Sequence, residues 1–327
     1  MYSPRSISSV LEGVEGGSAS RWLQGASRTA NLIDIVFSTE REIMYNSVLR
    51  DIKIVERVHE VALEPTSAPA GQEPFCDAHV QEAVKLEALY FSQCIHAVML
   101  STPLLAYMRR DCRFRVREYN AHIISEVRTY CRNLRMFNDD PLHSVLLISP
   151  SFIPSSATPR DPFRDAGMII DPSTRQMGFQ ETISCAADYV RDKFNIRKGH
   201  PVAELGSHLN EFQVDFLGYH RSLEEYNCHF RLEASIRVIC NILFRELEDT
   251  GGARAVMDLE EEKWTQFLKI LRLQLEEGLR RLRAQLDGID FSTLSEADKH
   301  DVEQELMSLH NSEGYVRMMA LARDFWS

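Results

Sequence analysis

The chain has 327 residues, of which 44% are hydrophobic and 26% are charged. This balance allows a sizeable buried core and excludes disorder over the whole length. The formal net charge of −11 disfavours a general nucleic-acid binder, because an acidic chain repels the phosphate backbone. Only 15 glycines and 12 prolines are present, which favours helices over strands joined by frequent turns.

Seven cysteines are widely spaced and form no C-x-x-C pair. A disulfide framework or a structural zinc site would cluster them, so reduced thiols are the better interpretation. Residues 1–17 contain no apolar run of signal-peptide length, and no window approaches the ~18 apolar residues that span a bilayer. We therefore expect an intracellular protein, cytoplasmic or nuclear, without membrane insertion.

The N-terminal part is predicted to be helical after a loose start. Residues 1–20 are rich in serine and glycine and are expected to be irregular. Residues 21–137 are assigned to an N-terminal helical bundle. Apolar residues spaced three or four apart predict helices over 22–64, 77–100 and 103–137. Ser101, Thr102 and Pro103 resemble a helix start, with a capping hydroxyl followed by proline in the first turn.

Residues 138–180 interrupt this pattern and hold half of the prolines. They are predicted to form an irregular connection, either a domain boundary or a functional loop. Residues 144–149, SVLLIS, have the composition of a strand. Residues 168–179 suggest a hairpin around the turn at Asp171, Pro172, Ser173 and Thr174.

Residues 181–327 are assigned to a C-terminal helical bundle. Helices are predicted over 182–194, over 201–250 with a bend near Glu233, over 264–286, and from 295 to the end. Gly251 and Gly252 are expected to terminate the second of these helices. The predicted fold class is therefore all-α, with elongated antiparallel bundles of long amphipathic helices and coiled-coil-like seams.

The most informative feature is an arginine stripe on the predicted helix 103–137. At 100° per residue, six arginines fall within about 100° of one another, opposite the apolar face. They are Arg110, Arg113, Arg117, Arg128, Arg132 and Arg135. Guanidinium groups bind carboxylate and phosphate, so this stripe predicts a surface for an acidic or phosphorylated protein partner, or less favourably for nucleic acid. Pairing with acidic helices of the same chain is the alternative interpretation.

Two further features are weaker. Phe325 and Trp326 place large aromatic side chains near the end of the sequence, where they could anchor a partner. Glu56 and His59 match one half of a carboxylate-bridged metal site, but no second Glu-x-x-His pair is present. The other candidate metal ligands share one face of a predicted helix, which a solvated face explains as well: Glu204, His208, Glu211 and Asp215.

No P-loop, dinucleotide fingerprint, nucleophile elbow or zinc-protease motif is present, and no cysteine has a recognisable catalytic setting. We therefore expect a non-enzymatic structural or adaptor subunit of an intracellular assembly, without a cofactor or metal, docking on protein partners or on a second copy of itself. The alternatives are a phosphate- or nucleic-acid-binding helical protein and a helical metalloenzyme built on Glu56, His59, Glu204 and His208.

Overall fold

A computed structural model describes most of the elements of the chain. The described residues are 16–44, 47–55, 58–65, 94–112, 114–123, 128–131, 136–137, 142–151, 167–177, 179–194, 202–216, 223–289 and 312–324, with six isolated positions between 293 and 308. This part of the chain is mostly helical, but it also contains two β-sheets. The prediction of a purely α-helical fold is therefore wrong.

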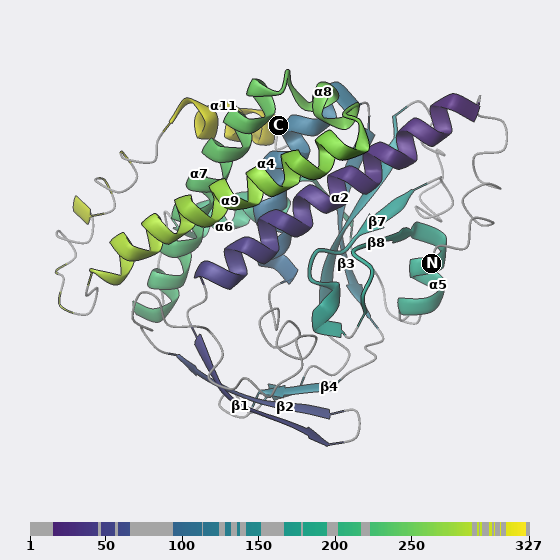
Figure 1. Cartoon of the computed structure of the whole chain (residues 1–327). Coiled ribbons are helices and arrows are strands. Elements are labelled where there is room, and N and C mark those ends of the chain that lie inside the picture. The colour runs from purple at the N-terminus through teal and green to yellow at the C-terminus, as the bar shows by residue number, and fades with distance from the viewer. Residues whose placement is uncertain are drawn as a thin grey trace.

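Eight α-helices are present in the described residues. They are α2 (Gly16–Met44), α4 (Cys94–Cys112), α5 (Ala186–Lys193), α6 (Ser207–Phe216), α7 (Leu223–Asp249), α8 (Ala253–Met257), α9 (Glu261–Asp287) and α11 (Glu313–Arg323). The long helices α2 and α9 run side by side across the molecule (Figure 1). Among these helices, none combines the length and the apolarity that crossing a membrane requires.

The two sheets differ in size and in strand direction. The smaller one has the order β1 (Ser47–Val55), β2 (Val58–Pro65), β4 (Arg128–Cys131), β5 (Met136–Phe137), and its β2–β4 pair is parallel. The larger one is antiparallel throughout, with the order β8 (Ile183–Cys185), β7 (Met168–Ile170), β6 (Leu142–Pro150), β3 (Phe114–His122), β9 (Val202–Glu204).

Two predicted helices are shorter than the sequence suggested. The helix expected over 22–64 ends at Met44 and is followed by β1 and β2. The helix expected over 103–137 ends at Cys112, where the chain turns into β3. In β3 the side chains of Phe114 and Val116 are buried while Arg115 and Arg117 are partly exposed, which is the alternation of a strand. Apolar residues three or four apart do not separate the two structures over such short segments.

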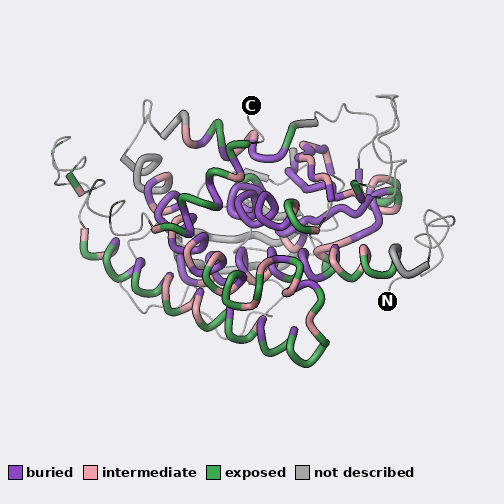
Figure 2. Tube along the Cα trace, turned by 90° about the horizontal axis from the view of Figure 1, so that it is seen from above, coloured by how far each residue is buried: buried purple, intermediate pink, exposed green. Residues whose placement is uncertain are grey.

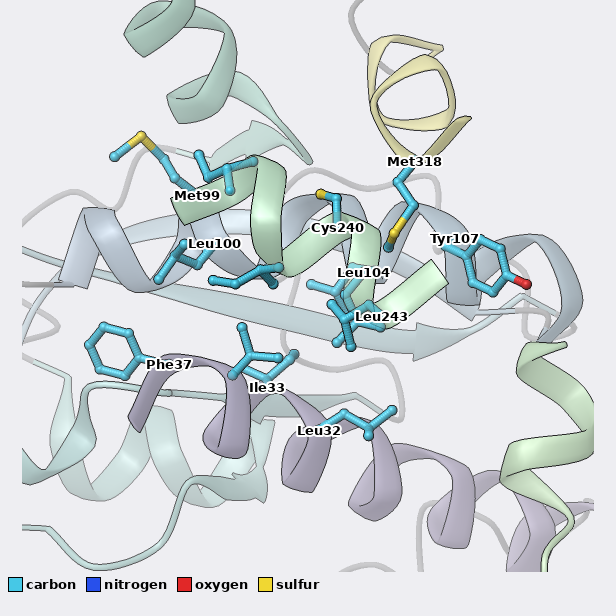
Figure 3. Packing of buried hydrophobic residues seen from close by; sticks show 14 of the residues in the cluster. Leu32, Ile33, Phe37, Met99, Leu100, Leu104, Tyr107, Cys240, Leu243 and Met318 are labelled. Atoms are coloured by element: carbon cyan, nitrogen blue, oxygen red, sulfur yellow. The ribbon is translucent and has the colours of Figure 1, made fainter. Parts of the chain in front are cut away.

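Helix α4 forms the centre of the core. Every residue from 97 to 108 is buried, so this helix is apolar on all sides and Pro103 lies inside it rather than at its start. Leu100 and Leu104 of α4 belong to the same buried cluster as Ile33 of α2 and Leu243 of α7 (Figure 3). Exposed residues gather on the outer faces of the surrounding helices (Figure 2). Because the core cluster draws on residues 26 to 319, it includes side chains from both predicted bundles.

Several local predictions are confirmed. The apolar positions of α9 are buried at Trp264, Leu271, Leu275, Leu279, Leu282 and Leu286. Gly251 and Gly252 follow α7 with φ angles of 102° and 92°, a conformation that favours glycine. Residues 144–149 lie in β6, in the middle of the larger sheet rather than in an irregular connection. The hairpin predicted within residues 168–179 does not form as predicted, because residues 168–170 pair with 183–185, beyond that range.

The larger sheet has a different cluster on each face. Leu146 and Ile148 of β6 belong to the cluster around α4, whereas Val145 and Leu147 pack with Tyr189 of α5. The sheet is therefore covered by α4 on one side and by α5 on the other, and this arrangement positions the site described next.

Candidate active site

Cys94 is the first residue of α4 and lies at the edge of the core. Its relative exposure is 9%, and the thiol is free of any disulfide. The residues that precede Cys94 lie outside the described part of the chain.

His143 and Asp171 face the same side of the larger sheet. In the β6–β7 pair Leu146 lies opposite Ile170 and Leu147 opposite Ile169. Continuing this register places Asp171 beside Val145, diagonal to His143 on the same face. The His143 Nε2 atom lies 2.9 Å from Asp171 Oδ1, and both residues are 0% exposed. The strands themselves thus fix the histidine against the carboxylate.

The Cys94 thiol hydrogen bonds with the His143 side chain. Because Nε2 is occupied by Asp171, the ring nitrogen left to face Cys94 is Nδ1. Burial opposes the charged form of the thiol, but His143 and a backbone hydrogen bond from Ser144 outweigh it and lower the pKa of Cys94. Burial also opposes the imidazolium, but the charge of Asp171 and its hydrogen bond raise the pKa of His143 to about 10. Both shifts favour a thiolate–imidazolium pair.

The other described cysteines whose pKa shifts are resolved behave in the opposite way. Burial, followed by the charge of Asp111, raises the pKa of Cys112 to about 12. Burial, followed by the charge of Glu233, raises the pKa of Cys240 above its usual range. Because the thiolate is the nucleophilic form of cysteine, the direction of the shift singles out Cys94.

A polar cluster adjoins Cys94 through Ser144. The Ser144 hydroxyl donates to Asn120 Oδ1 at 2.6 Å, and His208 Nε2 lies 3.1 Å from the same oxygen. The Ser144 Oγ atom also lies 3.4 Å from His208 Nε2, but its shorter contact is the hydrogen bond that it donates to Asn120. Glu118 accepts backbone N–H groups from Gly206 and His208 and so caps the start of α6. This cluster supports the site without forming a second nucleophile.

The predicted arginine stripe is not a face of one helix. Arg110 is exposed on α4, Arg117 lies on β3 with its Nε 3.9 Å from Glu204 Oε1, and Arg128 lies on β4 in the other sheet. Arg113, Arg132 and Arg135 lie outside the described residues. Because the helix ends at Cys112, the angular argument that grouped these arginines is wrong, and partner binding through them stays a prediction.

The remaining predicted site residues do not come together either. Phe325, Trp326 and Glu56 lie outside the described residues. His59 lies on β2 in the smaller sheet, whereas Glu204 ends β9 and His208 lies on α6. In the described part of the chain, no group of three or more His, Cys, Asp or Glu side chains is arranged to hold a metal ion. Cys94, His143 and Asp171 are joined by successive contacts instead: Cys94 interacts with His143, and His143 interacts with Asp171.

A cavity of about 360 Å³ lies at the opposite end of α4. It is bordered by Asp111 and Cys112 of α4, Trp22 of α2 and Arg254 of α8. Its lining does not include Cys94, His143 or Asp171.

Sequence reasoning missed Cys94, His143 and Asp171. The available signal was a polar residue at the end of each apolar run: Cys94 opens α4, His143 opens the SVLLIS strand, and Asp171 follows the MII strand. Reading this signal requires knowing that β6 and β7 are neighbours. Comparison with protein-family models, with curated proteins and with solved structures finds no match to this chain.

Proposed function

We propose that the protein is a cysteine-dependent acyl-transfer enzyme, with Cys94 as nucleophile, His143 as general acid and base, and Asp171 as the group that orients and charges His143. The observation that carries this proposal is the unbroken line from the Cys94 thiol through His143 to Asp171. Cysteine, histidine and an acidic or amide residue recur in this order of contact in nucleophilic enzymes of unrelated fold. The proposal departs from the non-enzymatic expectation, which depended on long helix faces.

The chemistry follows from the protonation states. The Cys94 thiolate would attack the carbonyl carbon of an amide, ester or thioester, and the carbon–sulfur bond would form as the carbonyl π electrons move to oxygen. His143 would then give its proton to the leaving nitrogen, oxygen or sulfur. At that step the bond from the carbonyl carbon to the leaving atom breaks, and the electrons on the oxyanion form the carbonyl again. Water or another acceptor, deprotonated by His143, would attack the resulting thioester and release the acyl group and the thiolate.

A structural role for the same residues is the competing explanation. A buried ion pair costs desolvation energy and is weak evidence for stability by itself. The pair in this protein ends on a thiol, and a purely structural network would gain nothing from a lowered cysteine pKa. These features favour catalysis over a structural role.

The first test uses iodoacetamide with the full chain at pH 6 to 7 and locates the adducts by mass spectrometry. We expect Cys94 to be alkylated at least tenfold faster than Cys112 and Cys240, because it alone of these three carries substantial thiolate. His143→Asn should reduce the Cys94 rate at least tenfold, and Cys240→Ser is the matched control that should leave it unchanged. Equal rates for all cysteines would overturn the proposal.

The second test measures acyl transfer with p-nitrophenyl acetate. Wild-type protein should release nitrophenolate with transient acetylation of Cys94, whereas Cys94→Ala should release it only at the background rate. Circular dichroism of both proteins controls for folding. Release that is unchanged in Cys94→Ala, with no acetyl adduct on Cys94 in the wild type, would contradict the proposed chemistry.

A further inference from the structure

Tyr189 of α5 contacts the side of Asp171 that faces away from His143. Its hydroxyl donates to Asp171 Oδ2 at 2.6 Å, while Asp171 Oδ1 lies 2.9 Å from His143 Nε2. Tyr189 is 1% exposed and Asp171 is 0% exposed. The carboxylate is therefore held between a phenol on one oxygen and an imidazole on the other, with its rotation fixed.

The tyrosine ring is itself held by neighbours on and after α5. Phe194 packs edge-on against it, with ring centroids 5.5 Å apart and an interplanar angle of 90°. The Lys193 ammonium lies 4.7 Å from the centroid of the Tyr189 ring and 4.0 Å from that of Phe179. Cation–π contacts of this kind hold a charge close to an apolar cluster. Helix α5 thus brings a hydroxyl donor and a positive charge to the same carboxylate.

We propose that Tyr189 is a positioning residue that orients the Asp171 carboxylate toward His143 and keeps it ionised, with Lys193 in a supporting role. This inference rests on the proposed acyl-transfer function, because it assigns the support of that same site to α5. Tyr189 touches neither Cys94 nor His143 in the hydrogen bonds described above; it acts through Asp171.

Electrostatics agrees with this geometry. Burial raises the pKa of Asp171, but the charge and hydrogen bond of His143, the hydroxyl of Tyr189 and the charge of Lys193 together hold that pKa below its usual value. Burial and the adjacent carboxylate raise the pKa of Tyr189 well above its usual value, so the phenol stays protonated and acts as a donor. Asp171 influences the pKa of Cys94 mainly through His143, which lowers that pKa. The charge of Asp171 itself acts weakly in the opposite direction.

Packing alone is the competing explanation, because Tyr189 belongs to a hydrophobic cluster. Tyr119 is a matched control, because it lies in the same cluster and is 0% exposed. Tyr189→Phe and Tyr119→Phe each remove one hydroxyl from one buried ring of this cluster. Only the first of them removes the donor to Asp171.

The experiment measures the rate of Cys94 alkylation by iodoacetamide between pH 4 and 9. In Tyr189→Phe we expect the rate at pH 6 to fall by about tenfold, and the acid limb of the profile to move to higher pH. The reason is that Asp171 without its donor is protonated at higher pH and then no longer charges His143. Tyr119→Phe should keep the wild-type profile. Lys193→Met should move the acid limb in the same direction by a smaller amount.

The outcomes separate this inference from the proposed function. Selective alkylation of Cys94 in the wild type, together with a wild-type profile in Tyr189→Phe, would overturn the role of Tyr189 alone. Equal effects of Tyr189→Phe and Tyr119→Phe would assign both to packing and overturn it as well. If Tyr189→Phe does not fold, the alkylation profile of Lys193→Met tests the proposal in its place. An acid limb in that variant at the wild-type pH would overturn the proposal. Unselective alkylation in the wild type would instead refute the acyl-transfer function.

Discussion

His143 Nε2 and Asp171 Oδ1 lie 2.9 Å apart, with both side chains shielded from solvent, although 28 residues separate them in the chain. The contact joins the start of β6 to the residue that follows β7. An ionised carboxylate at this distance stabilises the imidazolium form of histidine, and the imidazolium in turn stabilises the neighbouring thiolate. The three groups should therefore respond as a unit to substitution.

Asp171→Asn should slow alkylation of Cys94 by iodoacetamide at pH 6. The amide keeps the shape of the side chain but removes its charge, so the pKa of His143 should fall and that of Cys94 should rise. A change of one to two pKa units corresponds to a roughly 10- to 100-fold lower thiolate fraction. The measurement is the alkylation rate of Cys94 followed by mass spectrometry.

Asp287→Asn is the control for this substitution. Asp287 is a half-buried carboxylate at the end of α9 that accepts hydrogen bonds from Arg231 Nη2 at 2.8 Å and from Arg283 Nε at 3.1 Å. Its replacement should leave the Cys94 rate within about twofold of the wild type. A similar loss in both variants would show that the effect is general destabilisation rather than the loss of the Asp171 charge.

Glu118 should make the stability of the protein depend on pH. Burial raises the pKa of this carboxyl to about 7, although the N–H groups of Gly206 and His208 act to lower it. Between about pH 4.5 and 7 the folded state keeps a proton that the unfolded state has released. The free energy of unfolding should therefore fall as pH rises through this window, by on the order of 3 kcal/mol.

Glu118→Gln should remove this dependence, because the amide does not titrate. Urea unfolding at pH 5, 6, 7 and 8 would give the free energy of unfolding of wild type and variant. The contribution of Glu118 is the change with pH in the difference between these two free energies. Glu262→Gln, at an exposed position in the first turn of α9, is the control and should keep the wild-type slope. Parallel curves for wild type and Glu118→Gln would show that Glu118 does not titrate in this range.

Arg28→Ala should destabilise the fold far more than loss of its ion-pair partner. The Arg28 Nη1 atom donates to the carbonyl oxygens of Met257 at 2.8 Å and Leu259 at 2.6 Å, and the guanidinium lies 4.9 Å from the Trp264 ring centroid. Its removal leaves two carbonyls at the α8–α9 junction without this charged donor. We expect a loss of about 2–4 kcal/mol in the free energy of unfolding.

Glu261→Gln tests the ion pair by itself. The Glu261 side chain is 82% exposed and lies 3.2 Å from Arg28 Nη2. Exposed pairs of this kind contribute about 0.2–1 kcal/mol, so the variant should unfold at nearly the wild-type urea concentration. Comparable losses in Arg28→Ala and Glu261→Gln would mean that the carboxylate, not the backbone carbonyls, accounts for the role of Arg28.

Local features of the fold were predictable where one face of an element meets the core and the other meets water. Helix α9 buries Leu271, Leu275 and Leu279 at a spacing of four, and this pattern identified it without tertiary information. Gly251 and Gly252 marked the end of α7 because their positive φ angles are costly for other residues. The strand β6 was recognisable from its run of branched apolar residues.

The sequence by itself determined the apolar segments, their amphipathic faces and the turn at the end of α7. The tertiary structure alone decided that β3 is a strand, because its partner β6 lies elsewhere in the chain and pairing supplies the hydrogen bonds that a helix would have made locally. It also decided the site: Cys94, His143 and Asp171 belong to three different elements, and only the register of the sheet and the packing of α4 bring them into contact. Chemistry of this kind depends on distances across the fold, which spacing along the chain does not encode.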